Sequence, residues 1–175
     1  MAETSPFAAL RRRPFLRWGL GITGALLGTS AGGWLALFGV APSAGPLEVL
    51  GDREHRTLAS LVPTILGRAR HGLSSSIALA FDGFLADEPA DVVSDLRSAL
   101  LWIELGPILY DGRASIFTDL SQSEREAHFR RWMESDDPTR RMVATAFRKF
   151  INFVAYDDPV LWDEIHYPGP ATGLR

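Results

Sequence analysis

Cysteine is absent from the whole 175-residue chain. Its absence excludes disulfide bonds, c-type haem attachment, thiolate-ligated iron–sulfur clusters and a cysteine nucleophile. Hydrophobic residues make up 46% of the chain, which is enough for a domain of this size to be stabilised by its apolar core alone. We therefore expect a folded protein without covalent cross-links.

The sequence has no basic patch outside the N-terminal region. The net charge is −3, the isoelectric point is about 5.8, and Lys149 is the only lysine. Proteins that bind nucleic acids need a basic surface to neutralise phosphate groups. Nucleic acid is therefore not an expected partner.

Segments in which apolar and polar residues alternate, as in β-strands, are also missing after residue 46. Apolar residues recur instead at spacings of three and four, which predicts an all-α fold, a small bundle of about five helices. Proline and glycine at 168–170 predict an extended C-terminal tail. Local signals predict the helix ends: Asp52 and Gly67 for the first helix, Ser74 to Ser76 before the second, Pro89 and Gly106-Pro107 for the third, Ser121 with Glu124 for the fourth, and Asp137-Pro138 for the fifth.

The sequence fingerprints of nucleotide sites and of a serine nucleophile elbow are absent, and the four histidines lack the spacing of a metal pair. Glu124 and His128, four residues apart, are expected to form an ordinary surface pair. Glu104 lies in an apolar context, and two interpretations stay open: a buried carboxylate with a raised pKa, or a surface side chain on an amphipathic helix. We predict no catalytic, cofactor-binding or metal-binding residue.

The N-terminus carries the most specific motif of the chain. Two arginines, a further residue, Phe, Leu and a basic residue mark twin-arginine export signals. An apolar run of 24 residues follows, at 18–41, and as a helix it would span about 36 Å, enough to cross a membrane. The signal residues are Arg12, Arg13, Phe15, Leu16 and Arg17.

This motif predicts a twin-arginine signal or signal-anchor at 1–45, followed by a helical domain at 46–175. The twin-arginine translocase is then an expected partner. The arginines keep the N-terminus in the cytoplasm, so the domain would lie in the periplasm or on the periplasmic face of the inner membrane. Cleavage after Ser43 and retention of residues 18–41 as a membrane anchor both stay open.

Aromatic residues gather at the C-terminal end, at Tyr156, Trp162 and Tyr167. Two interpretations stay open: these side chains pack against their own bundle, or they dock on a partner as aromatic anchors. The extended tail favours docking, and we expect the contact to involve Trp162, Tyr167, Pro168, Gly169 and Pro170.

Much of the chain after residue 50 resembles the gluconate 2-dehydrogenase subunit 3 family. The resemblance includes residues 52–66, with Glu-His-Arg-Thr-Leu at 54–58 and Pro63, and it extends over 117–170, where His166 replaces a small residue of the family. The residues that carry it there are Phe117, Leu120-Ser121, Glu124-Arg125-Glu126, Trp132, Ser135, Arg140-Arg141, Tyr156, Pro159, Trp162 and Tyr167-Pro168-Gly169-Pro170.

The resemblance implies a non-catalytic accessory small subunit of an FAD-dependent dehydrogenase of the glucose-methanol-choline type. FAD would belong to the large partner subunit, and a multihaem cytochrome c subunit often accompanies it. The export signal favours the same role, because the twin-arginine route carries folded proteins and a cofactor-loaded partner can cross with this chain.

Two alternatives remain. The first is a free-standing exported helical enzyme or metal protein, which requires side chains among Glu104, Glu124, His128 and His166 to converge in one pocket. The second is a membrane-anchored structural protein without a redox partner.

Overall fold

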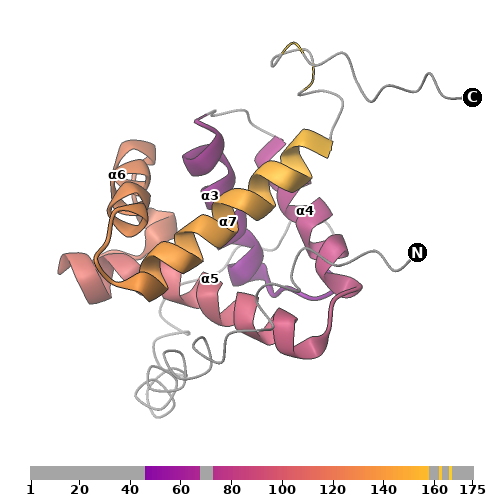
Figure 1. Ribbon diagram of the computed structural model, residues 1–175, viewed down its shortest axis with the longest axis horizontal. Helices are drawn as coiled ribbons and strands as arrows, with labels where there is room; N and C mark the ends of the chain where they lie inside the picture. The colour runs from indigo at the N-terminus through magenta and orange to yellow at the C-terminus, as the bar shows by residue number, and fades with distance from the viewer. Residues whose placement is uncertain (1–45, 68–72, 158–161, 163–165, 167–175) are drawn as a thin grey trace, which may run out of the picture.

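The structure is a computed structural model that describes residues 46–67, 73–157, 162 and 166 (Figure 1). The described part is all-α, as predicted, with five α-helices, one short 3-10 turn and no β-strand. The predicted export signal at 1–45 and the tail motif at 167–170 lie outside the described residues. The elements are α3 (Asp52–Leu66), α4 (Leu73–Ala86), α5 (Ala90–Asp111), η2 (Phe117–Asp119), α6 (Gln122–Met133) and α7 (Pro138–Asp157).

Helix α3 lies at the centre of the bundle and contacts each of the other four helices and η2. Figure 1 shows α7 crossing α3, with α6 near the N-terminal end of α7 and α4 near its C-terminal end. The apolar residues of α3 recur at helical spacing, and Leu58, Leu61 and Val62 are all buried. The central position of α3 follows from this broad buried face.

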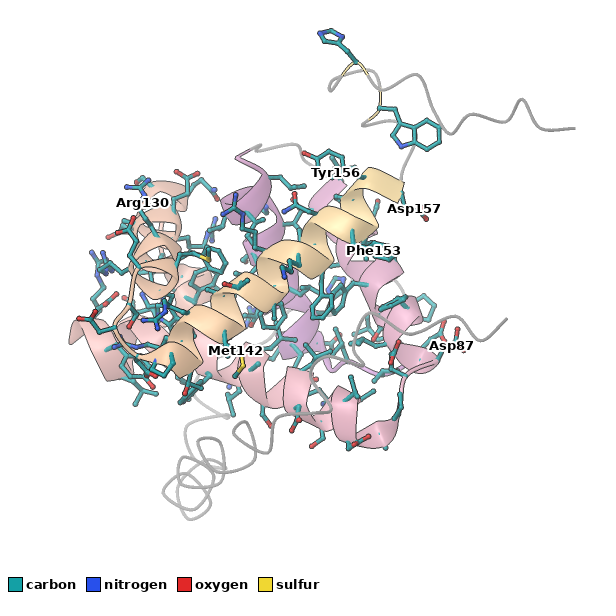
Figure 2. The ribbon with its side chains drawn as sticks, viewed as in Figure 1. Asp87, Arg130, Met142, Phe153, Tyr156 and Asp157 are labelled. Atoms are coloured by element: carbon teal, nitrogen blue, oxygen red, sulfur yellow. The ribbon has the colours of Figure 1, made fainter. Side chains whose placement is uncertain are left out.

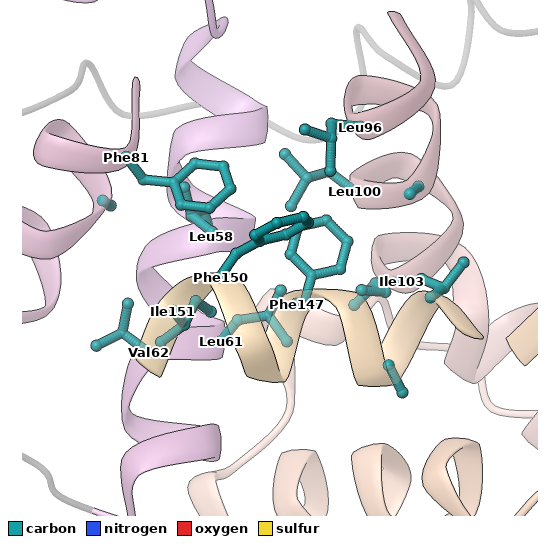
Figure 3. Close-up of a cluster of buried hydrophobic side chains, with 14 of the residues drawn as sticks. Leu58, Leu61, Val62, Phe81, Leu96, Leu100, Ile103, Phe147, Phe150 and Ile151 are labelled. Atoms are coloured by element: carbon teal, nitrogen blue, oxygen red, sulfur yellow. The ribbon is translucent and has the colours of Figure 1, made fainter. Parts of the chain in front are cut away.

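One continuous core joins the helices (Figure 3). The rings of Phe81 and Phe150 lie edge to face, with centroids 6.2 Å apart, so α4 and α7 meet through aromatic packing. Each large apolar side chain that is fully buried contributes roughly 1.5–3 kcal/mol relative to exposure. The labelled members of this core are Leu58, Leu61, Val62, Phe81, Leu96, Leu100, Ile103, Phe147, Phe150 and Ile151.

Local capping signals fix several helix ends as predicted. Gly67 closes α3 in the left-handed conformation, with φ of 65°. Ser121 and Glu124 form the predicted capping box of α6, in which the Glu124 carboxylate accepts the backbone N–H of Ser121 at 2.9 Å. At the start of α3, however, the N-cap is Gly51 and Asp52 is the first helical residue. Glu54 replaces the expected Asp52 cap, because its carboxylate accepts the N–H of Gly51 at 2.7 Å.

Helix α4 begins earlier than predicted. Ser74 to Ser76 lie inside it, since the helix starts at Leu73. The first turn of a helix has backbone N–H groups without intrahelical partners, so serine is tolerated there as well as before the helix.

Helix α5 is longer than predicted, because Gly106-Pro107 does not end it. The helix continues to Asp111 and closes at Gly112, where φ is 65° and the N–H of Arg113 donates to the carbonyl of Pro107 at 3.0 Å. Pro107 has no N–H for the ladder, which costs the helix one hydrogen bond. Contacts of Tyr110 and Asp111 with α6 and α7 stabilise the extra turn.

A strap, residues 46–50, precedes α3 and is fixed by one buried carboxylate. Asp82 of α4 is 1% exposed and accepts the backbone N–H groups of Glu48, Val49 and Leu50 at 2.6, 3.1 and 2.7 Å. Leu50 is itself buried in the core. The strap therefore belongs to the folded part of the chain that the structure describes.

Candidate functional site

Glu104 is at one of two buried polar centres that contain residues considered in the sequence analysis as possible site residues. Its side chain is 1% exposed, so the buried interpretation of this carboxylate is confirmed. The hydroxyl of Thr118 donates to Oε1 at 2.7 Å, and the hydroxyl of Thr57 lies 3.2 Å from Oε2. Burial raises the pKa of Glu104, and the hydrogen bonds from Thr118 and Thr57 and the nearby charge of Arg53 only partly oppose this shift.

The position of Glu104 in the fold explains these contacts. It projects from α5 toward Thr57 of α3 and Thr118 of η2, so its carboxylate joins three elements. A carboxylate whose oxygens are held by hydroxyl and backbone donors is well placed to fix those elements relative to one another. Within the described residues its hydrogen-bond partners are groups of the chain itself.

An open cleft of about 1030 Å³ lies between α3, α4 and α5, with Glu104 and Thr57 among its lining residues. Its apolar lining includes Leu85, Val93 and Leu101. An ion pair between Arg97 and Glu54, 2.8 Å apart, also borders it. Charges of both signs line this cleft, so they select no single class of ligand.

His128 forms the second buried polar centre and is also 1% exposed. Its Nδ1 lies 2.6 Å from the Asp111 carboxylate, which also accepts Arg131 Nη2 at 2.5 Å. Burial lowers the pKa of His128, although the hydrogen bond and charge of Asp111 oppose the shift. Partial burial tends to raise the pKa of Asp111, but hydrogen bonds from Arg131 and His128 outweigh it and lower that pKa.

The predicted surface pair of Glu124 and His128 is wrong, because the two side chains have different surroundings. Glu124 is bound by Arg113, whose Nη1 lies 2.5 Å from its carboxylate, and by Ser121. These hydrogen bonds, Arg113 first, lower the pKa of Glu124 to about 2. His128 instead faces the core, where its ring lies among those of Phe117 and Trp132.

A glycine allows the close approach of α5 and α6 at this centre. A Cβ atom at Gly106 would lie 2.7 Å from His128 Nε2 and 2.9 Å from the ring of Trp132, closer than real Cβ contacts allow. Trp132 also packs edge to face against Trp102 and Tyr110. Gly106 therefore serves helix packing here, and this explains why the helix tolerates it.

Glu104, Glu124 and His128 are thus held by separate partners, and His166 is an exposed residue with φ of 53° after α7. In the described ranges, no group of three or more His, Asp or Glu side chains is arranged to hold a metal ion. The sequence signals did not reveal Asp111, the partner of His128, or Arg131, which pairs with Asp111, because no motif connects these residues, which are 17 and three positions from His128.

The aromatic residues near the C-terminus form a different kind of candidate site. The indole Nε1 of Trp162 donates to the backbone carbonyl of Tyr156 at 2.8 Å. Tyr156 is 40% exposed and Phe153, one turn earlier in α7, is 58% exposed. Phe153 was not among the predicted site residues, although an aromatic residue on the polar face of an amphipathic helix is a usable signal.

The other predicted site residues lie outside the described ranges. These are the export-signal residues Arg12, Arg13, Phe15, Leu16 and Arg17, and the tail residues Tyr167, Pro168, Gly169 and Pro170. Across the helices that the structure describes, none is both long and apolar enough to span a bilayer. Comparison with protein families, curated proteins and solved structures finds no match to this chain.

Proposed function

We propose that this protein is a non-catalytic accessory small subunit of an exported FAD-dependent dehydrogenase of the glucose-methanol-choline type. In this role it assists the export, maturation or anchoring of the catalytic subunit. FAD belongs to that partner, and a multihaem cytochrome c subunit completes the complex. The twin-arginine translocase recognises Arg12 and Arg13, and the domain acts in the periplasm or at the periplasmic face of the inner membrane.

The observation that carries this proposal is the aromatic end of α7. Phe153 and Tyr156 are exposed, and Trp162 is bonded to the Tyr156 carbonyl next to them. Aromatic side chains of this kind are typical anchors of protein interfaces. They lie in the same C-terminal region of the sequence as Tyr-Pro-Gly-Pro at 167–170, the most distinctive part of the family resemblance.

The buried polar residues support a binding role in a second way. The carboxylate of Glu104 is held by the hydroxyls of two threonines. His128 is bonded to Asp111, and its ring lies next to the backbone of α5 at Gly106. Both therefore contribute to packing between helices. Several residues of the resemblance have similar positions: Phe117 and Trp132 are buried, and Arg141 donates to the carbonyl of Ser135.

A pull-down of the tagged, exported chain tests this function. We expect a larger protein to co-purify, and the absorbance spectrum of the eluate to contain the bands of oxidised flavin. A variant with Lys at both Arg12 and Arg13 is the matched control, and it should reduce the amount of both proteins in the periplasm. A colourless chain that elutes without a flavoprotein would contradict the proposal.

A further inference from the structure

Helix α7 has two large aromatic residues on the face that points away from the core. Lys149, Phe153 and Tyr156 follow at spacings of four and three residues, so they lie along one stripe of the helix, and all three are exposed. Residues on the opposite face, such as Phe147 and Ile151, fill the core. The stripe is therefore not needed for the burial of α7 in its own bundle.

A neighbouring helix widens this stripe into a patch. The ring of Phe84, from α4, lies 6.1 Å from the ring of Phe153 at a tilt of 56°. Figure 2 shows Phe153 and Tyr156 at the C-terminal end of α7, where Trp162 bonds the Tyr156 carbonyl. The last carbonyls of a helix lack intrahelical partners, so this bond fixes the indole at the helix end. We call Phe84, Phe153, Tyr156 and Trp162 the aromatic patch.

Charges at the two ends of the stripe give the patch a direction. Arg148 and Lys149 are exposed before Phe153, whereas Asp157 is exposed directly after Tyr156. Protein interfaces combine an aromatic centre with a charged rim, and the rim charges of the two partners are complementary. A surface that fits this stripe therefore has an apolar pocket with carboxylates on the side that meets Arg148 and Lys149.

We propose that the aromatic patch, together with Lys149, is the surface through which this chain docks on the flavin-containing subunit. The inference rests on the proposed function and specifies its contact surface. The matching surface of the partner has an apolar pocket that takes Phe153, and acidic residues beside it that pair with Lys149 and Arg148.

The test uses the flavoprotein that co-purifies with the wild-type chain, recognised by its oxidised-flavin spectrum. In the full-length chain, Phe153→Ser and Tyr156→Ser should each weaken the binding of this protein at least tenfold, because interface aromatics are common hot spots. Leu109→Ser is the matched control. Leu109 is 47% exposed but lies on α5, outside the patch, so its variant should bind like wild type. Helical circular dichroism shows whether each variant is folded.

A second measurement does not depend on removing a side chain. A photo-reactive benzoylphenylalanine at position 153 should cross-link to the flavoprotein, while the same residue at position 109 should not. Lys149→Glu should weaken binding and make it less sensitive to salt, since it reverses one rim charge.

The outcomes separate this inference from the proposed function. Equal binding by all variants, with no cross-link from position 153, would overturn the docking surface, while the flavoprotein captured by the wild-type chain would still support the accessory-subunit role. If the wild-type chain captures no flavoprotein, both proposals fail. If Phe153→Ser instead converts a dimer of this chain into a monomer, the patch binds a second copy and the inference is wrong. Deletion of residues 167–175 tests whether the tail covers the patch. If this deletion and Phe153→Ser destabilise the fold equally, and neither changes flavoprotein binding, the tail covers the patch and the inference is wrong.

Discussion

Two buried side chains, Glu104 and His128, make the stability of this protein depend on pH in opposite directions. Glu104 is a carboxyl group whose pKa is raised in the folded chain, mainly by burial. Its contribution to folding is complete below its unfolded pKa and is lost as the pH rises through the folded pKa. For His128, whose pKa is lowered by burial, the contribution is present above the unfolded pKa and is lost as the pH falls through the folded pKa.

The first prediction concerns Glu104→Gln. The amide keeps the shape of the side chain and still accepts a hydrogen bond from Thr118, but it does not ionise. We expect the free energy of unfolding of wild type to fall relative to this variant as the pH rises from about 4 to about 8. Urea unfolding over this range is the measurement. Glu134→Gln, at an exposed carboxylate, is the control, and parallel curves for all three proteins would disprove the assignment.

The second prediction concerns His128→Asn, whose amide can still donate to Asp111. We expect the free energy of unfolding to fall by roughly 1–3 kcal/mol at neutral pH, because the smaller side chain does not make the ring contacts with Phe117 and Trp132. On acidification below the ordinary histidine pKa of 6.5, wild type should lose stability that the variant does not lose. The charges of Arg113 and Arg131 oppose a positive ring, while Asp111 favours it. Thermal unfolding at several pH values tests this, and an unchanged difference between the proteins would refute it.

At the scale of the helix, α5 shows why a glycine can be required inside a regular element. Alanine at position 106 would place its Cβ against His128 and Trp132, and we expect Gly106→Ala to destabilise the protein by about 1–3 kcal/mol. Gly83 of α4 provides the matched control, because among the described residues an added Cβ there meets only the flexible end of Glu48, at 3.8 Å. Gly83→Ala should stabilise by about 0.5–1 kcal/mol through helix propensity. Denaturant unfolding of both variants measures the contrast, which would be absent if α5 and α6 were loosely packed.

A comparison of α5 with α3 and α6 distinguishes helix ends that sequence patterns can predict from those that they cannot. The C-terminal end of α3 and the N-terminal end of α6 were predictable, because Gly67 and the pair Ser121 and Glu124 act through contacts within a few residues. The continuation of α5 through Pro107 was not, because it depends on Asp111 and Tyr110 meeting side chains of α6 and α7. Local preference gives way to tertiary contacts at such positions.

The candidate site follows the same division. The apolar sequence neighbours of Glu104 are compatible with burial and with a surface position. Burial depends on Thr57 and Thr118, which surround its carboxylate but are distant from it in the sequence. The partner of His128, Asp111, comes from a different helix, and the Arg131 side chain that shares this carboxylate comes from the next turn of α6, so no local motif indicates the cluster. Glu124 was correctly predicted as a helix cap and wrongly as a partner of His128, since only the first role is local.

For the whole molecule, Asp82 joins the strap at 46–50 to the helical bundle. Replacement by alanine would leave three N–H groups of the strap, two partly buried and one buried, without their acceptor, and we expect Asp82→Ala to cost about 3 kcal/mol or more. Asp87→Ala, at an exposed carboxylate just after the same helix, is the control and should have little effect. Unfolding experiments give the cost, and hydrogen exchange should become faster at Val49 and Leu50. Unchanged exchange at both residues would mean that the core alone holds the strap.

The position of Lys149 has a practical consequence for following this protein in solution. It is the single lysine of the chain, so an amine-reactive fluorophore can attach only there or at the chain's N-terminal amine. Lys149 is exposed and lies one helical turn from Phe153, on the outward stripe of α7. A dye at this position would report solvent polarity at the aromatic patch without any engineered cysteine. The natural composition of the chain thus supplies a site-specific optical probe.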